Sequence, residues 1–333
     1  MSTNSRTSPT ERLLAGLSER QREAVTHTDG PLLIVAGPGS GKTRVMAHRV
    51  AYLVGEKGIR PWKILAVTFT NKAARELRDR CERLVGYGSD ELQVKTFHGF
   101  CSGVLRLDGE HVGLKPEFTI YDDDDQARMA RRILDDLDID PKQFPPRALL
   151  GVVSHAKNNM WTPAQFAERT ETYREEVAAR VYEAYESALL RSNAVDFDDL
   201  LLKTFMLFEG FPEVLEKYQQ RYEHLLVDEF QDTNPLQFQI ARLLALKNRN
   251  ICVVGDPDQS IYSWRHADPA NLTDFQATFK GTKIVTLDQS YRSTQIILEA
   301  ADAVIGNNDD RMEKELWTEN SRGNRVTVAE AYN

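Results

Sequence analysis

The sequence predicts an α/β fold built around a parallel β-sheet. Short apolar runs, typical of buried strands, alternate with segments of helical character along most of the chain. The first of these runs leads into a glycine-rich turn that ends in Gly41-Lys42-Thr43. A later run ends at the adjacent carboxylates Asp228 and Glu229. Because parallel sheets place their ligands at the carboxyl ends of the strands, these polar groups are expected to meet at one site.

The expected strands fall into two blocks. The early block comprises residues 32–36, 64–69 and 92–96, and the late block comprises residues 225–227, 251–255 and 283–287. The long segment between the blocks reads mostly as helices punctuated by prolines, with one short strand-like piece at 118–121. Because the two polar motifs lie on opposite sides of this segment and must meet, we expect residues 112–193 to form an inserted, mainly helical subdomain.

The end of the chain is expected to begin another domain. The strand at 283–287 is followed by a polar stretch, then by a helix through about Gly306, and then by a further strand at 325–329. This order is that of an opening βαβ unit. The expected divisions are therefore 1–111 and 194–282 for the first lobe, 112–193 for the insertion and 283–333 for the start of a second lobe.

Composition places the chain among ordinary globular proteins, with 41% hydrophobic and 28% charged residues. No apolar run approaches the roughly 20 residues that span a bilayer, and the N-terminus lacks the apolar core of a signal peptide, so a cytoplasmic protein with no membrane partner is expected. Three scattered cysteines fit neither a disulfide framework nor a zinc site. The net charge of −8 argues against coating by nucleic acid but allows a local groove with aromatic platforms. The acidic run 122–125 is interpreted as a helix N-terminus.

The glycine-rich turn has the chemistry that a nucleoside triphosphate needs. Its glycines allow backbone N–H groups to surround phosphates, and the following helix presents its positive end to them. Lys42 is placed to reach the β- and γ-phosphates, and the Thr43 hydroxyl is placed to bind Mg²⁺. The strict pattern opens with glycine, whereas this chain has Ala36. The alternative is a glycine-rich turn that holds no ligand.

The acidic motif supplies the complementary groups. Asp228 suits a direct or water-mediated contact with Mg²⁺, and Glu229 suits a general base that orients and deprotonates the water attacking the γ-phosphate. Standing alone, the two carboxylates would be interpreted as the cap of a helix N-terminus. Together with Lys42 and Thr43 they are interpreted as catalytic groups acting on a nucleoside triphosphate.

Further motifs carry a resemblance to a known family. In order they are residues 17–25 (LSERQREAV), 36–43 (AGPGSGKT), 67–74 (VTFTNKAA), 96–100 (TFHGF), 195–200 (VDFDDL), 228–232 (DEFQD), 254–265 (VGDPDQSIYSWR) and 289–292 (QSYR). The chain resembles the N-terminal half of the superfamily-1 DNA helicases of the UvrD/PcrA/Rep type along nearly its whole length. The resemblance implies a RecA-like P-loop NTPase sheet with an inserted, mainly helical subdomain.

The resemblance also implies roles around Mg-ATP. Gln21 would pair with the adenine edge and Tyr291 would stack on it, while Gln259, Arg265 and Arg292 would contact the γ-phosphate. The alternative for Arg292 is a surface cation. The implied catalytic residues are Lys42, Asp228, Glu229, Gln259 and Arg292; the nucleotide-binding residues are Gln21, Gly37, Gly39, Ser40, Gly41, Lys42, Thr43, Arg44, Arg265 and Tyr291; the Mg²⁺ ligands are Thr43 and Asp228.

A second set of residues is implied to bind single-stranded DNA, through base stacking on aromatic rings and polar contacts between them. The set is Thr68, Phe69, Asn71, Thr96, Phe97, His98, Tyr262 and Trp264. A phenylalanine beside a sheet is commonly a core residue, so Phe97 has a structural alternative, as does His98. Trp264 has little apolar company in its polar stretch and is expected to be exposed.

The function implied is an ATP-dependent 3′-to-5′ translocase or helicase acting on single strands and on duplex–single-strand junctions, with repair or replication proteins as partners. The family's second RecA-like lobe carries an arginine that reaches the γ-phosphate, and the chain ends before it, so the chain is expected to bind ATP and DNA better than it hydrolyses ATP. The alternative is a non-motor module that binds ATP and DNA. A subunit of a helicase–nuclease complex would need a nuclease domain. Pathway and oligomeric state stay open.

Overall fold

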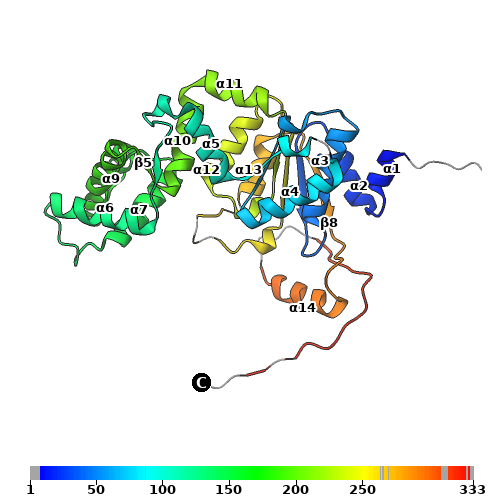
Figure 1. The fold of residues 1–333 in the computed structure, drawn as a ribbon. Coiled ribbons are helices and arrows are strands. Elements are labelled where there is room, and N and C mark those ends of the chain that lie inside the picture. The colour runs from blue at the N-terminus through cyan, green and yellow to red at the C-terminus, as the bar shows by residue number, and fades with distance from the viewer. Residues whose placement is uncertain are drawn as a thin grey trace, which may run out of the picture.

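The predicted parallel sheet forms the centre of the molecule. The computed structural model describes residues 8–86, 88–262, 264, 266–268, 270–308, 314–327 and 329–330. Six strands pair in parallel in the order β3-β2-β6-β7-β1-β8 (Figure 1). Their bounds are Leu32–Ala36 (β1), Ile64–Thr68 (β2), Gln93–Thr96 (β3), His224–Val227 (β6), Ile251–Gly255 (β7) and Lys283–Leu287 (β8).

Helices cover both faces of the sheet because successive strand residues point to opposite sides. In β1, Leu33 and Val35 belong to one core and Leu32 and Ile34 to the other. The first core is covered by α5 (Phe97–Asp108), α10 (Phe197–Gly210), α11 (Pro212–Arg221), α12 (Pro235–Ala245) and α13 (Asn271–Thr278). The second is covered by α1 (Pro9–Leu14), α2 (Glu19–Thr26), α3 (Lys42–Gly55) and α4 (Asn71–Val85). The three cysteines are buried and unpaired.

A group of helices between the two strand blocks has a core of its own. It comprises α6 (Asp123–Asp136), α7 (Pro146–Asn158), α8 (Pro163–Ala167) and α9 (Tyr173–Arg191), and lies to one side of the sheet in Figure 1. At its base the short strands β4 (Thr119–Ile120) and β5 (Ala194–Val195) pair in parallel. Asp122 caps α6 by accepting hydrogen bonds from two backbone N–H groups, which confirms the acidic run as a helix N-terminus. We propose that residues 112–193 are the inserted subdomain.

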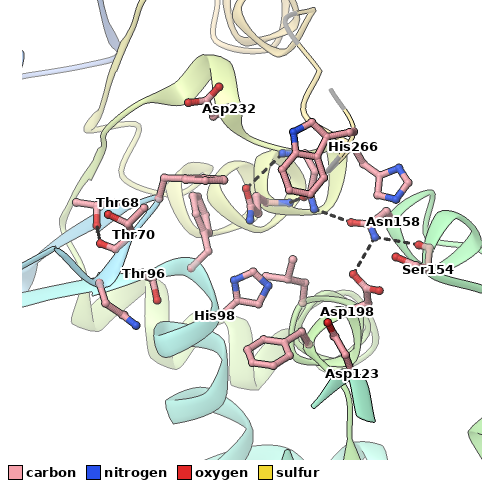
Figure 2. Close-up of a pocket in the computed structure, with 18 residues that line it drawn as sticks. Thr68, Thr70, Thr96, His98, Asp123, Ser154, Asn158, Asp198, Asp232 and His266 are labelled. Atoms are coloured by element: carbon pink, nitrogen blue, oxygen red, sulfur yellow. Dashed lines mark hydrogen bonds between the residues drawn. The ribbon is translucent and has the colours of Figure 1, made fainter. Parts of the chain in front are cut away.

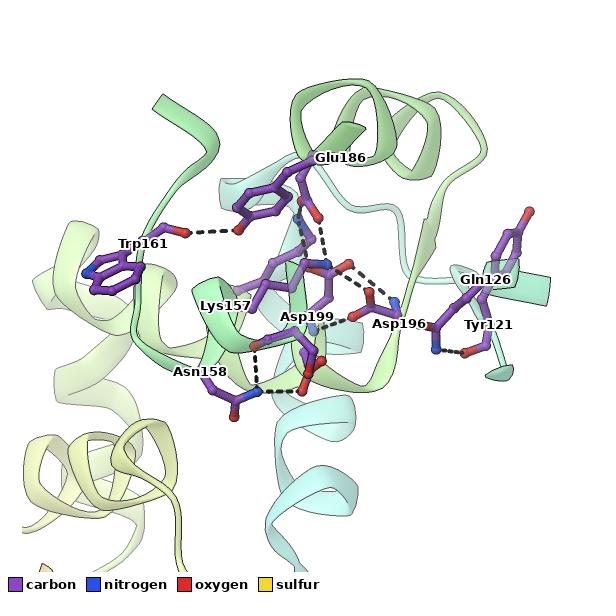
Figure 3. A network of polar contacts seen from close by, with 12 residues as sticks. Tyr121, Gln126, Lys157, Asn158, Trp161, Glu186, Asp196 and Asp199 are labelled. Atoms are coloured by element: carbon purple, nitrogen blue, oxygen red, sulfur yellow. Dashed lines mark hydrogen bonds and ion pairs between the residues drawn. The ribbon is translucent and has the colours of Figure 1, made fainter. Parts of the chain in front are cut away.

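A buried cluster of charges attaches this group of helices to α10. Lys157, near the end of α7, pairs with Asp196 and Asp199, which begin α10, at 2.8 Å each. Its Nζ also lies 2.6 Å from Glu186 of α9 (Figure 3). The cluster therefore links α7, α9 and α10 through one buried lysine side chain.

The C-terminal part differs from expectation in two places. β8 pairs with β1, so residues 283–287 complete the main sheet, and we propose that the first lobe extends through Leu287. The expected helix is confirmed as α14 (Gln295–Ile305). The expected strand at 325–329 is wrong for the residues described there, which belong to no strand and are exposed. A strand needs a neighbour for its backbone groups, and the apolar pattern of this segment does not supply one.

No helix within the described residues is long and apolar enough to cross a membrane.

Candidate active site and nucleic-acid interface

The carboxyl edge of the sheet collects most of the residues that the motifs single out. β1 leads to Lys42, β6 to Asp228 and β7 to Asp256, which are neighbours in the sheet order. β2 and β3 lead to Thr68 and Thr96 at the other end of the same edge. The parallel sheet thus places a site of the kind that binds nucleotides, and a second, separate groove, along the same edge.

The glycine-rich turn leads into the N-terminus of α3. Gly39 and Gly41 have φ values of 74° and 88°, which favour glycine. A Cβ on Gly39 would lie 2.6 Å from the Cβ of Arg292, so the close approach also needs glycine. The Ser40 hydroxyl donates to the carbonyl of Gly37 at 2.7 Å and braces the turn. Backbone N–H groups at such a terminus form an anion site.

Lys42 lies at the centre of a polar cluster. Its Nζ forms an ion pair with Glu229 at 2.7 Å and lies 3.5 Å from Oε1 of Gln259. Gln231 donates from Nε2 to Glu229 at 3.0 Å. Glu229 has a φ of 49°, a left-handed conformation that is strained for a residue with a side chain and is common at functional sites. The structure therefore brings together three of the residues assigned to catalysis.

Asp228 is a buried carboxylate that suits a cation. It is 5% exposed and accepts the N–H of Glu229 at 3.0 Å. Burial, and then the charge of Glu229, raise the pKa of Asp228 to about 7. The described residues contain no group of three or more metal-ligating side chains, so a Mg²⁺ ion here would depend on Asp228, Thr43 and phosphate oxygens. Mg²⁺ is commonly held in this way.

A pocket of about 270 Å³ adjoins the glycine-rich turn and is lined by Gln21, Ser40, Tyr291 and Trp317 among others. Gln21 donates to the Ser40 carbonyl at 2.8 Å and accepts the Ser18 N–H at 3.1 Å, so its amide is held in place by the protein. Tyr291 is 45% exposed. The pocket thus combines polar groups with two aromatic side chains, a lining that suits a nucleobase.

Other residues of the expected nucleotide site are less engaged. Thr43 and Arg44 lie in the first turn of α3, and Arg292 is exposed beside Gly39. Arg265 lies outside the described residues. Trp317 was not predicted as a site residue from the sequence. A single tryptophan in a polar stretch does not indicate that it will line a pocket with residues far away along the chain.

The second groove has a volume of about 580 Å³ and lies between the sheet edge and the inserted helices (Figure 2). Seven of the expected DNA-binding residues line it: Thr68, Phe69, Asn71, Thr96, Phe97, His98 and Trp264. The eighth, Tyr262, packs beside it, with its ring 4.8 Å from that of Phe69 and 6.2 Å from that of Trp264. The three rings form an aromatic row, in which Trp264 is 68% exposed.

Several of these residues also have structural roles in the fold. Phe97 is 4% exposed and packs in the core, which favours its structural alternative over base stacking. The Thr96 hydroxyl caps α5 by accepting the Gly99 N–H. Thr68 is 1% exposed and donates to the Thr70 carbonyl at 3.1 Å. His98 lies edge-on to Phe197, with ring centroids 5.9 Å apart.

The far wall of the groove was not assigned from the sequence. Asn158 donates from Nδ2 to Asp198 and to the Ser154 carbonyl at 2.9 Å each, as Figure 2 shows. It accepts from Nδ2 of Asn234 at 2.6 Å. Asn234 caps α12 and follows the acidic motif. A lone asparagine gives no sequence signal for such a bridge; the nearest signal is Asp198 within the 195–200 motif.

Known proteins are similar along nearly the whole chain. A family model described as the UvrD/REP helicase N-terminal domain matches residues 17–280. A Bacillus subtilis protein named ATP-dependent DNA helicase PcrA is 47% identical over 315 residues, covering 95% of this chain and 43% of that protein. Proteins of the same name from Leuconostoc citreum and Staphylococcus aureus are 48% and 46% identical, and 43% and 44% of their lengths are covered. The chain thus spans under half the length of these relatives.

Proposed function

Because the chain belongs to the UvrD/REP helicase family, whose motor lobes are RecA-like, we propose that it is the first motor lobe of an ATP-dependent DNA helicase. In this role it binds Mg-ATP and single-stranded DNA and contributes to 3′-to-5′ movement. The observation that carries the proposal is the placement of the Lys42–Glu229–Gln259 cluster and the aromatic groove along one edge of one sheet. Its DNA partners are single strands and duplex–single-strand junctions.

Each residue of the cluster has a task in hydrolysis. Lys42 gives its charge to the β- and γ-phosphates, and Gln259 contacts the γ-phosphate. The carboxylate of Glu229 now pairs with Lys42, so a bound triphosphate would take Lys42 and release Glu229 to accept a proton from water. Mg²⁺, held by Thr43, Asp228 and the nucleotide, would neutralise phosphate charge.

The groove favours bases over phosphates. Asp123, Asp198 and Asp232 are among its lining residues, and carboxylates repel the DNA backbone. The aromatic row offers ring faces, on which any base can stack. A single strand would therefore turn its bases towards the groove and its phosphates towards solvent.

Two variants test the assignment of the cluster. Lys42→Ala removes a cation from the phosphates and should weaken Mg-ATP binding. Glu229→Gln keeps the shape but removes the base, so ATP binding should persist while hydrolysis falls by about 10²–10⁴. ATP affinity and hydrolysis are measured for both, with and without oligothymidylate.

The pattern of loss decides the outcome. An equal loss of ATP affinity in both variants would contradict the separate roles. Tight ATP and DNA binding by the unmodified chain, without hydrolysis stimulated by DNA, would favour the non-motor binding module instead.

A further inference from the structure

Asp256 is a fully buried residue that contacts Gln231 through its backbone and Gln259 through its carboxylate. Its backbone N–H donates to Oε1 of Gln231 at 2.9 Å. Its Oδ2 accepts from Nε2 of Gln259 at 2.5 Å. A buried carboxylate is stable only when it is paired with an opposite charge and hydrogen-bonded. The second oxygen of Asp256, Oδ1, therefore also needs a partner.

That partner is Lys314, which comes from the segment beyond α14. Its side chain is 1% exposed and pairs with Asp256 and, at 2.9 Å, with Asp258. Lysine is rarely buried so fully unless it is paired. Lys314 lies outside all of the sequence motifs described above.

The segment around Lys314 is held against the glycine-rich turn. Ser290 donates its N–H to the Trp317 carbonyl at 2.8 Å, and Trp317 donates to the Asp288 carbonyl at 3.2 Å. Leu316 packs so close to Gly37 that its Cδ2 would lie 2.3 Å from a Cβ there. Lys314 is thus anchored in the fold and is not a chance surface contact.

We propose that Lys314 is a positioning residue for ATP hydrolysis, an inference that rests on the proposed function. It holds the Asp256 carboxylate, which fixes the amide of Gln259 with its oxygen facing Lys42. Asp256 also holds Gln231, whose amide donates to Glu229. Lys314 acts through the Asp256 carboxylate and Gln259, since the contact of Asp256 with Gln231 is made by its backbone N–H.

Removal of the Lys314 cation would leave the buried Asp256 carboxylate without its ion-pair partner. Without Lys314 the buried carboxylate would take up a proton, which makes it a weaker acceptor for the Gln259 amide, or turn away, which removes the acceptor. A small misplacement of a group near the reacting atoms costs about 10²-fold in rate. Binding of the β-phosphate by the glycine-rich turn does not pass through Gln259, so affinity for ADP should persist.

The test compares Lys314→Met with Lys314→Arg in the full chain. The first keeps length and loses charge; the second keeps charge. Lys247→Met, which breaks an exposed pair with Glu216, is the matched control. ATP and ADP affinities are measured by displacement of a fluorescent nucleotide, and hydrolysis by single turnover at saturating ATP with oligothymidylate.

Lys314→Met should lower hydrolysis by about 10²-fold and reduce the ATP-over-ADP preference, with ADP affinity unchanged. Lys314→Arg should restore most of both. Adding Gln259→Ala to Lys314→Met should cost no more than Gln259→Ala alone. Unchanged hydrolysis and ATP preference in Lys314→Met, equal losses in the arginine variant, or additive losses in the double variant would each overturn the proposal.

Two further comparisons separate a folding defect and a failure of the proposed function. If Lys314→Met does not fold, Asp256→Asn with Lys314→Met removes both buried charges and should show the same loss; full hydrolysis there would overturn the proposal. If the unmodified chain neither binds nor hydrolyses ATP, the proposed function fails. If it does both and Lys314→Met matches it, only this inference fails.

Discussion

At the scale of single residues, Trp264 is the clearest test of the groove. Its ring is 68% exposed at the end of the aromatic row. A base stacked on a ring contributes roughly 1–3 kcal/mol whatever its identity. Trp264→Ala should weaken binding of mixed-sequence single strands by that amount and leave the salt slope nearly unchanged, because no charge is removed. Fluorescence anisotropy at several salt concentrations measures both quantities.

Trp62→Ala serves as its control, since Trp62 lies before β2, at the opposite end of that strand from the groove. A sharp fall in the thermal stability of Trp264→Ala with unchanged DNA affinity would identify Trp264 as a core residue and move the DNA path elsewhere.

His224 makes stability depend on pH. It is 6% exposed at the start of β6, and burial, followed by the charge of Arg49, lowers its pKa to about 4. In the unfolded chain it titrates near 6.5, so the unfolded state binds the extra proton between these values. The contribution of His224 to the free energy of unfolding should be complete above pH 6.5 and should fall by roughly 3 kcal/mol as the pH drops to 4.

Urea denaturation between pH 7.5 and 4.5 measures this loss. Burial also lowers the pKa values of His27 and His48, so His224→Gln should reduce the pH dependence of the free energy of unfolding only in part. An unaltered slope in His224→Gln would contradict the argument.

At the scale of elements, the cluster around Lys157 holds α7, α9 and α10 together (Figure 3). Lys157→Met would leave three acidic side chains without their shared cation. Breaking a buried pair in this way costs about 3–5 kcal/mol. Chemical denaturation should show this loss in the free energy of unfolding, whereas Lys247→Met at an exposed pair should cost under about 1 kcal/mol. Equal effects of the two variants would show that the cluster is not stabilising.

Elements differ in how well sequence alone predicts them. The strands 32–36 and 251–255 have the predicted bounds, because a buried parallel strand is a continuous apolar run between turn residues. The strand 283–287 also has its predicted bounds, although it is partly exposed at the edge of the sheet. The partner of a strand is less predictable. The run at 283–287 is equally apolar whether it opens a new sheet or closes this one beside β1.

The candidate site likewise contains residues that the sequence predicts and residues that it does not. Lys42, Glu229 and the groove residues follow from short motifs whose chemistry is local. The bridge between Asn158 and Asn234 joins distant segments through one hydrogen bond, and neither residue belongs to a periodic pattern. The strand expected at 325–329 fails because an apolar alternation cannot say whether a neighbouring strand exists.

At the scale of the molecule, the acidic motif connects the two sites. Glu229 lies in the cluster, whereas Asp232 and Asn234 line the groove. The bond from Asn234 to Asn158 ties the groove wall to this motif. Asn158→Ala should lower the stimulation of ATP hydrolysis by single strands about 5-fold or more, which is the lower end of typical coupling free energies, while ATP affinity stays unchanged.

Steady-state hydrolysis with and without oligothymidylate measures this coupling. Ser154→Ala is the matched control, because Asn158 contacts only the backbone carbonyl of Ser154. Undiminished stimulation in Asn158→Ala would show that the two sites communicate by another route.

The position of β8 at the outside of the sheet has a consequence for behaviour in solution. Its outer backbone groups could accept a strand from another copy, and Ile284 is 45% exposed on it. Lys283, which begins the strand and pairs with Glu23 at 2.6 Å, places charge at this edge. Charged side chains at an edge oppose strand addition. We therefore expect Lys283 to oppose the pairing of this edge with a strand of another copy.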